Sequence, residues 1–172
     1  MVLKRPFFVF CHGMKAASLN EIKKELQTLD PETIRALCMR LAKYKKENKE
    51  LLTYLLYEAD NEQAYIAAIK EDLDELFTEL PSRTNLYYVK KSLRKILRFA
   101  NKQIKYSGIK QTELELRIYF CSKVREEKIP LREGTVLYNL YQQQLKKIYA
   151  IVLKLPEDLQ LDYQPEIKMI DL

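Results

Sequence analysis

The sequence predicts an all-α protein of about seven helices, stacked as antiparallel hairpins in a helical bundle or a short solenoid-like array. From Ser18 almost to the end, apolar residues recur at spacings of three and four, which is the period of a helix face. The 172 residues include only three Gly and six Pro, so there is little material for the turns that join strands. No segment shows two alternating strands around such a turn.

Composition favours one globular domain, because 47 % of the residues are hydrophobic and 31 % are charged. We expect this single helical domain to span residues 18–158. No apolar run approaches the ~18 residues of a membrane span. Three cysteines without a C-x-x-C pair indicate neither a disulfide framework nor a zinc site. We therefore expect a cytoplasmic protein with no membrane partner.

The N-terminal residues 1–17 share only the outline of a signal peptide. Basic residues precede an apolar patch, but Phe7 to Cys11 is five residues long, against the ~7–15 of a functioning signal. We expect residues 1–17 to be a disordered or mis-assigned extension, with Met14 as an alternative start.

The first four predicted helices begin at recognisable caps. Ser18 opens a capping box, and Asp30-Pro31-Glu32 ends that helix and begins the second. Asn48 is the predicted cap of the third helix, and Asp60 or Asn61 that of the fourth. Their apolar faces are Ile34, Leu37, Cys38 and Leu41 on the second, Leu51, Leu52, Leu55 and Leu56 on the third, and Tyr65, Ile66, Ile69, Leu73, Leu76, Phe77 and Leu80 on the fourth.

Three further helices follow. The fifth runs from about Asn85 to Gly108, where glycine can adopt the left-handed cap conformation. The sixth begins at about Thr112 as its cap, and the seventh spans about 133–155. Residues 159–172 contain a proline and no clear period, so we expect an extended C-terminal tail, with a short helix as the alternative.

The residues that most enzymes use are scarce. His12 is the one histidine, and the three glycines are isolated, which nearly excludes histidine chemistry and nucleotide-binding loops. We expect no catalytic residue, no cofactor and no metal. A carboxylate-dependent metal enzyme is the remaining alternative, with acids of the fourth helix as ligands: Glu71, Asp72, Asp74, Glu75 and Glu79.

The most unusual stretch is cationic. Between Leu80 and Thr112 there are nine Lys or Arg residues and no acid, so the rest of this +6 chain sums to −3. At about 100° per residue, the basic helix 86–106 has an apolar stripe about 100° wide beside a cationic arc of about 140°. Tyr88, Phe99 and Tyr106 form an aromatic line at its edge. The candidate phosphate-binding residues are Lys91, Arg94, Lys95, Arg98, Lys102 and Lys105.

The acidic fourth helix offers an internal explanation for these cations. From Asp60 to Glu79 there are seven acids and one lysine, a net of −6. Opposite charges could flank the seam between the two helices, although the outer part of the cationic arc should remain in solvent. We therefore expect a non-enzymatic protein-interaction or scaffold module with an unknown protein partner. The alternative is a nucleic-acid-associated protein that binds phosphates through the basic helix.

Two stretches carry a resemblance to known sequences. The first is SLNEIKKELQTLDPETIRALCMRLAKYKKENKELL, and the second is KKSLRKILRFANKQ with the ELELRIYFCSKV that follows. They resemble a bacterial family of small helical proteins with no assigned function, catalogued as a domain of unknown function. The resemblance covers most of Ser18 to Val152. It implies a cytoplasmic helical fold and supplies no activity and no binding residues.

Overall fold

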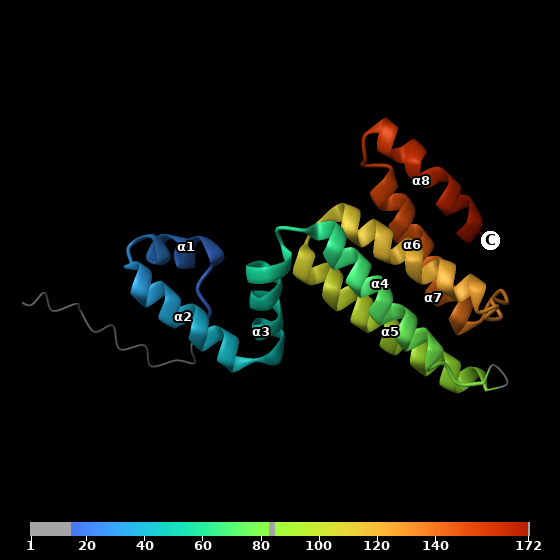
Figure 1. Ribbon diagram of the computed structural model, residues 1–172, viewed down its shortest axis with the longest axis horizontal. Helices are drawn as coiled ribbons and strands as arrows, with labels where there is room; N and C mark the ends of the chain where they lie inside the picture. Colours follow the sequence, from blue (N-terminus) through green and yellow to red (C-terminus); the bar gives the residue numbers. More distant parts are fainter. Residues whose placement is uncertain (1–14, 83–84, 172) are drawn as a thin grey trace, which may run out of the picture. The chain divides into compact units, whose positions relative to one another are not determined.

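The structure, a computed structural model, describes residues 15–82 and 85–171. These residues form eight α-helices and one π-helical turn, η1, with no strand among them, so the predicted all-α class is confirmed (Figure 1). Most of the predicted N-terminal extension, residues 1–14, lies outside the described residues. The elements are α1 (Leu19–Gln27), α2 (Pro31–Tyr44), α3 (Lys46–Thr53), η1 (Tyr54–Glu58), α4 (Glu62–Thr78), α5 (Leu86–Ser107), α6 (Lys110–Glu126), α7 (Val136–Val152) and α8 (Glu157–Ile170).

The chain divides into two compact units, residues 1–49 and 50–172, where the sequence predicted one domain over 18–158. The boundary falls inside α3. None of the residues of α1, α2 or α3 is buried, although these helices have apolar faces. Residues that bury no side chain contribute little to a shared core, which is why the first unit separates from the second.

Local capping determines where the helices of the first unit begin. The Oγ atom of Ser18 accepts a hydrogen bond from the backbone N–H of Glu21 (3.3 Å), and the Glu21 carboxylate accepts from the Ser18 N–H (2.8 Å), so the predicted capping box is present. Asp30 caps α2 as predicted. The prediction for Asn48 was wrong, because it lies inside α3 and its side chain donates to the Leu41 carbonyl (2.9 Å).

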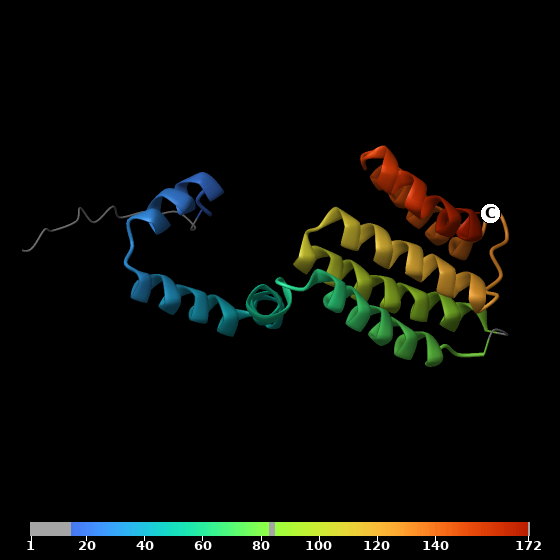
Figure 2. The same cartoon turned by 45° about the horizontal axis from the view of Figure 1, so that its top comes forward.

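The second unit is organised around α6. This helix packs against α4, α5, α7 and α8, and α4 and α5 also pack against each other (Figure 2). Buried side chains project from α6 in several directions, as expected for a helix enclosed by neighbours. They include Leu114, Leu116, Ile118, Phe120, Cys121 and Val124.

Helix α5 matches its prediction within a residue at each end. Gly108 ends it with a φ of 68°, a conformation that glycine adopts without the steric cost of a side chain. The predicted apolar stripe supplies the side chains that α5 buries: Val89, Leu93, Ile96, Ala100 and Ile104. The opposite side of the helix is thereby directed away from the core.

The C-terminal segment is helical, so the predicted extended tail is wrong and the alternative of a helix is confirmed. Helix α8 contains Pro165, which interrupts the apolar period of the sequence. Its buried residues Tyr163, Ile167 and Ile170 face α6, and this packing outweighs the loss of one backbone donor at the proline. None of the helices described here is long and apolar enough to cross a membrane.

We predict that Tyr141→Phe lowers the free energy of unfolding by about 1–2 kcal/mol, because a buried carbonyl loses its donor. Tyr141 is fully buried, and its hydroxyl donates to the Ile170 carbonyl (2.5 Å). Urea unfolding measures the loss, and hydrogen exchange should show its largest increase in α8. The control is Tyr57→Phe, which changes a side chain that is 76 % exposed and should alter stability little.

Candidate functional site

Helix α5 carries all six predicted phosphate-binding residues. Five of them are exposed and one, Lys102, is half-buried. Lys91, Arg94 and Arg98 make no ion pair with any described residue. Their charge is therefore available to a molecule outside the described chain.

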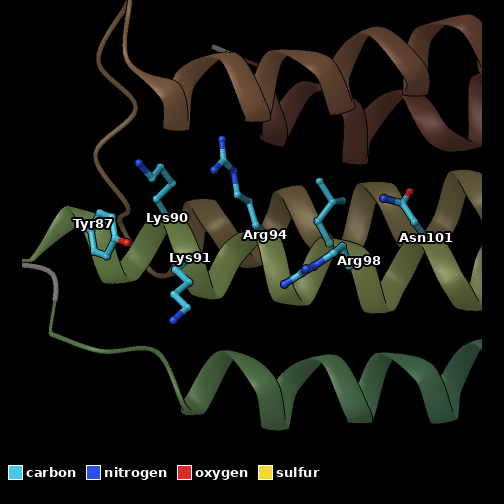
Figure 3. A pocket seen from close by; sticks show the side chains of 7 residues that line it. Tyr87, Lys90, Lys91, Arg94, Arg98 and Asn101 are labelled. Atoms are coloured by element: carbon cyan, nitrogen blue, oxygen red, sulfur yellow. The ribbon is translucent and has the colours of Figure 1, made fainter.

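A surface pocket of about 460 Å³ lies over this side of α5. In Figure 3, the side chains of Lys90 and Arg94 point to one side of the helix and that of Lys91 to the other. The charged ends diverge instead of meeting at one point, which suits an extended anion better than a single small ion. The residues that line the pocket are Tyr87, Lys90, Lys91, Arg94, Leu97, Arg98 and Asn101.

Two predicted binding residues are paired within the fold. The Lys102 ammonium lies 2.9 Å from the Glu50 carboxylate, which also accepts a hydrogen bond from the Tyr106 hydroxyl (2.6 Å). Lys95 lies 3.5 Å from Glu79, and both side chains are about two-thirds exposed, at 63 % and 66 %. Such an exposed pair contributes at most about 1 kcal/mol, so Lys95 remains available to a ligand while Lys102 is held more firmly.

The acidic helix α4 pairs with α6 more than with α5. Asp74 accepts from the Tyr119 hydroxyl (2.7 Å) and lies 2.9 Å from the Lys123 ammonium. Lys70 pairs with Glu115 of α6 at 3.1 Å. Among the described residues, the one ion pair along the seam of α4 and α5 joins Lys95 to Glu79, the residue that follows α4, so charge pairing there is much weaker than the sequence suggested.

The predicted aromatic line is only partly exposed. Tyr88 is 52 % exposed, and the neighbouring Tyr87, which the prediction did not include, is 63 % exposed. Phe99 instead packs against the core, and Tyr106 is half-buried against Glu50. The rings accessible to a ligand are therefore at the N-terminal end of α5.

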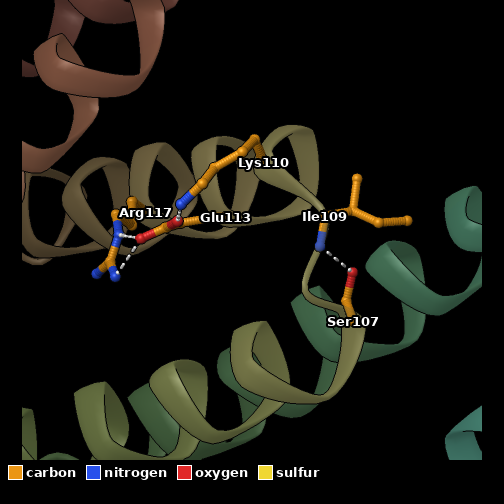
Figure 4. A network of polar contacts seen from close by, with 5 residues as sticks. All are labelled: Ser107, Ile109, Lys110, Glu113 and Arg117. Atoms are coloured by element: carbon orange, nitrogen blue, oxygen red, sulfur yellow. Dashed lines mark hydrogen bonds and ion pairs between the residues drawn. The ribbon is translucent and has the colours of Figure 1, made fainter. Parts of the chain in front are cut away.

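A separate polar network connects α6 to α7. Figure 4 shows Glu113 between Lys110 and Arg117, with the Lys110 ammonium 2.8 Å and the Arg117 Nη2 atom 2.8 Å from its carboxylate. Arg117 is buried and also donates to the Gln144 side chain (2.7 Å). The buried Arg117 is thus held by both Glu113 and Gln144, so its charge is committed to the fold.

The remaining candidates from the sequence are the acids of α4 and the cysteines. Among the described residues, no three His, Cys, Asp or Glu side chains form a group that could hold a metal ion. The acids of α4 therefore form no such group either. Burial raises the pKa of the Cys121 thiol to about 12. Cys38, expected on a buried face, is exposed.

The predicted binding residues did not include four residues of the pocket: Tyr87, Lys90, Leu97 and Asn101. Lys90 belongs to the cationic arc, and Tyr87 and Asn101 fall within it on the helical wheel, so the wheel could have identified these three. Leu97 lies at the edge of the apolar stripe, next to Lys90, and gave no such signal. The Lys102–Glu50 pair had no comparable signal, because it depends on how α3 packs in the folded chain.

Comparisons of the chain with protein-family models, with curated proteins and with solved structures give no match.

Proposed function

We propose that this chain is a non-enzymatic helical binding protein whose cationic α5 surface holds the phosphates of a nucleic acid. The observation that supports the proposal most is that Lys91, Arg94 and Arg98 border one pocket and form no ion pair within the described chain. Paired cations would have to leave an internal partner before they could bind phosphate. Lys91, Arg94 and Arg98 can bind phosphate without first breaking an internal ion pair.

The spacing of the exposed cations suits a strand of phosphates. Lys91, Arg94, Arg98 and Lys105 fall within about 60° of the helical wheel. They extend over about 21 Å of helix, taking a rise of 1.5 Å per residue. At the spacing of a duplex strand, about 3.4 Å along the axis, about six phosphates span that length, and a more extended single strand places fewer there. Four cations in a row can therefore each lie near a phosphate.

The exposed tyrosines favour nucleic acid over an acidic protein. Tyr87 and Tyr88 lie beside the cations with ring centroids 5.4 Å apart, and more than half of each side chain is exposed. Nucleic-acid bases stack on such rings, with about 1–3 kcal/mol per base. An acidic peptide gains no comparable contact, so the combination of cations and rings matches a single-stranded nucleic acid best.

We predict that Arg94→Glu/Arg98→Glu weakens binding to a mixed-sequence single strand by at least about 100-fold, because two attractive phosphate contacts become repulsive. Fluorescence anisotropy of a labelled strand measures the affinity. Both side chains are exposed, so circular dichroism should show an unchanged fold.

Lys146→Glu/Lys147→Glu is the matched control, because it changes two exposed cations of α7 and alters the net charge equally. It should weaken binding much less. Equal losses in the two double variants would show that net charge alone attracts the strand, and the α5 surface would be excluded as the site. Poly-glutamate that competes as well as RNA of equal charge would indicate an acidic protein partner instead.

A further inference from the structure

A second pocket, of about 340 Å³, lies where η1, α4 and α5 meet within the second unit. It shares no lining residue with the cationic pocket of α5. Its lining also has the opposite charge, since carboxylates and phenol rings line it where cations line the pocket of α5. The six side chains that give it this character are Glu50, Glu58, Asp72, Tyr54, Tyr65 and Tyr106.

Tyrosine rings form the inner wall of this pocket. Tyr54 and Tyr65 are buried, with ring centroids 4.7 Å apart and planes tilted by 59°. Their hydroxyls are already engaged: Tyr54 donates to Glu62 (2.8 Å) and Tyr65 to the Gln103 side chain (3.0 Å). The rings therefore offer carbon surface, which suits the methylene or methyl groups of a ligand.

Carboxylates border the same pocket. Glu58 and Asp72 are exposed, and neither forms an ion pair with a residue that the structure describes. A pocket edged by two such carboxylates attracts cations, because neither is paired with a basic side chain of the described chain.

The chain's own Lys102 shows what kind of cation this wall accepts. Its ammonium lies 2.9 Å from the Glu50 carboxylate and 6.0 Å from the centre of the Tyr106 ring. An alkylammonium group is thus already held between a carboxylate and a phenol ring at one side of the pocket. Glu58, Asp72, Tyr54 and Tyr65 line the same pocket and supply the same kinds of group, and no described lysine is paired with either carboxylate.

We infer that this pocket binds a small organic ammonium ion, with its charge at Glu58 and Asp72 and its alkyl part against the tyrosine rings. Ammonium groups are attracted both to carboxylates and to aromatic rings. The volume of about 340 Å³ falls in the range of about 300–1,000 Å³ that is usual for small-molecule sites. A divalent metal ion would instead need several oxygen ligands converging on one point.

Titration with putrescine, a short diammonium ion, tests the inference on the full chain. The NMR ring signals of Tyr54, Tyr65 or Tyr106 should shift in a saturable way, whereas 1,4-butanediol, its neutral analogue, should produce no such shift. Glu58→Gln/Asp72→Asn should weaken putrescine binding by at least about tenfold, because the charge is removed while the size of each side chain is kept.

Glu71→Gln/Glu75→Gln is the matched control, because it removes two exposed charges of α4 that do not line the pocket. It should change putrescine affinity by no more than about twofold, since exposed charges farther away are screened. The inference is overturned if putrescine causes no saturable ring shift, if butanediol binds equally well, or if both double variants lose the same affinity. Nucleic-acid binding should be intact in Glu58→Gln/Asp72→Asn, so the two sites can fail independently.

Discussion

Replacing Arg117 by leucine is expected to lower the free energy of unfolding by about 3 kcal/mol, because it removes one member of a buried charged network. The Arg117 side chain is 5 % exposed, and its Nε and Nη2 atoms donate to Glu113 at 3.1 and 2.8 Å. Its Nη1 atom donates to Gln144, which is also buried. The substitution leaves the Gln144 oxygen without this donor in the interior of the unit. Urea unfolding measures the change.

The double variant Arg117→Leu/Gln144→Leu separates two effects: the loss of the Arg117–Gln144 hydrogen bond and the loss of packing. Removing donor and acceptor together leaves no orphaned oxygen, so we expect it to regain about 1 kcal/mol over the single variant. Glu113 keeps Lys110 as a partner in both variants. A single variant as stable as the parent chain would mean that Arg117 contributes nothing to the second unit.

Replacing Glu62 by alanine is expected to cost a similar amount, about 3 kcal/mol, because three hydroxyls lose a charged acceptor. The Glu62 carboxylate accepts from Tyr54 (2.8 Å), from Ser107 (2.5 Å) and from Thr112. These donors belong to η1, α5 and α6, so one side chain connects four elements. The buried Thr112 hydroxyl would keep no such acceptor. The exposed Glu71→Ala exchange is the control and should change stability by less than about 0.5 kcal/mol.

The same carboxylate makes stability depend on pH. Burial alone would raise the pKa of Glu62, but the hydrogen bonds from Ser107, Thr112 and Tyr54 outweigh it and lower the pKa below its ordinary 4.5. The contribution of Glu62 is therefore fully present above its pKa in the unfolded chain, and it is lost as the pH falls through the lower folded value. Between pH of about 6 and about 3, the parent should lose more stability than Glu62→Ala does. Equal losses of stability in the parent and in Glu62→Ala would contradict the assignment of this pH dependence to Glu62.

Sequence periodicity was sufficient to predict the position of α5 and the face that it buries. Its five buried residues repeat at the spacing of a helix face, and Gly108 supplies the end signal. The exposure of Lys91, Arg94 and Arg98 followed from the same wheel, because a cationic arc of about 140° cannot all face one neighbour.

The remaining features depend on tertiary contacts. Thr112 looked like a helix cap, yet α6 begins at Lys110 and Thr112 is buried in its first turn, bonded to Glu62 fifty positions away. Pro165 hid the period of α8, which packing against α6 stabilises. Lys102 was grouped with the binding residues because nothing near it in the sequence identified Glu50 as its partner.

The salt dependence of binding tests the proposed α5 surface most directly. If Lys91, Arg94, Arg98 and Lys105 each neutralise one phosphate of a single strand, log K against log [salt] should have a slope of about −3. In the neutral variant Arg94→Gln/Arg98→Gln, the slope should fall to about −1.4, because two of the four contacts are gone. A slope near zero in the parent chain, or an equal slope in the variant, would contradict a phosphate-binding role for α5.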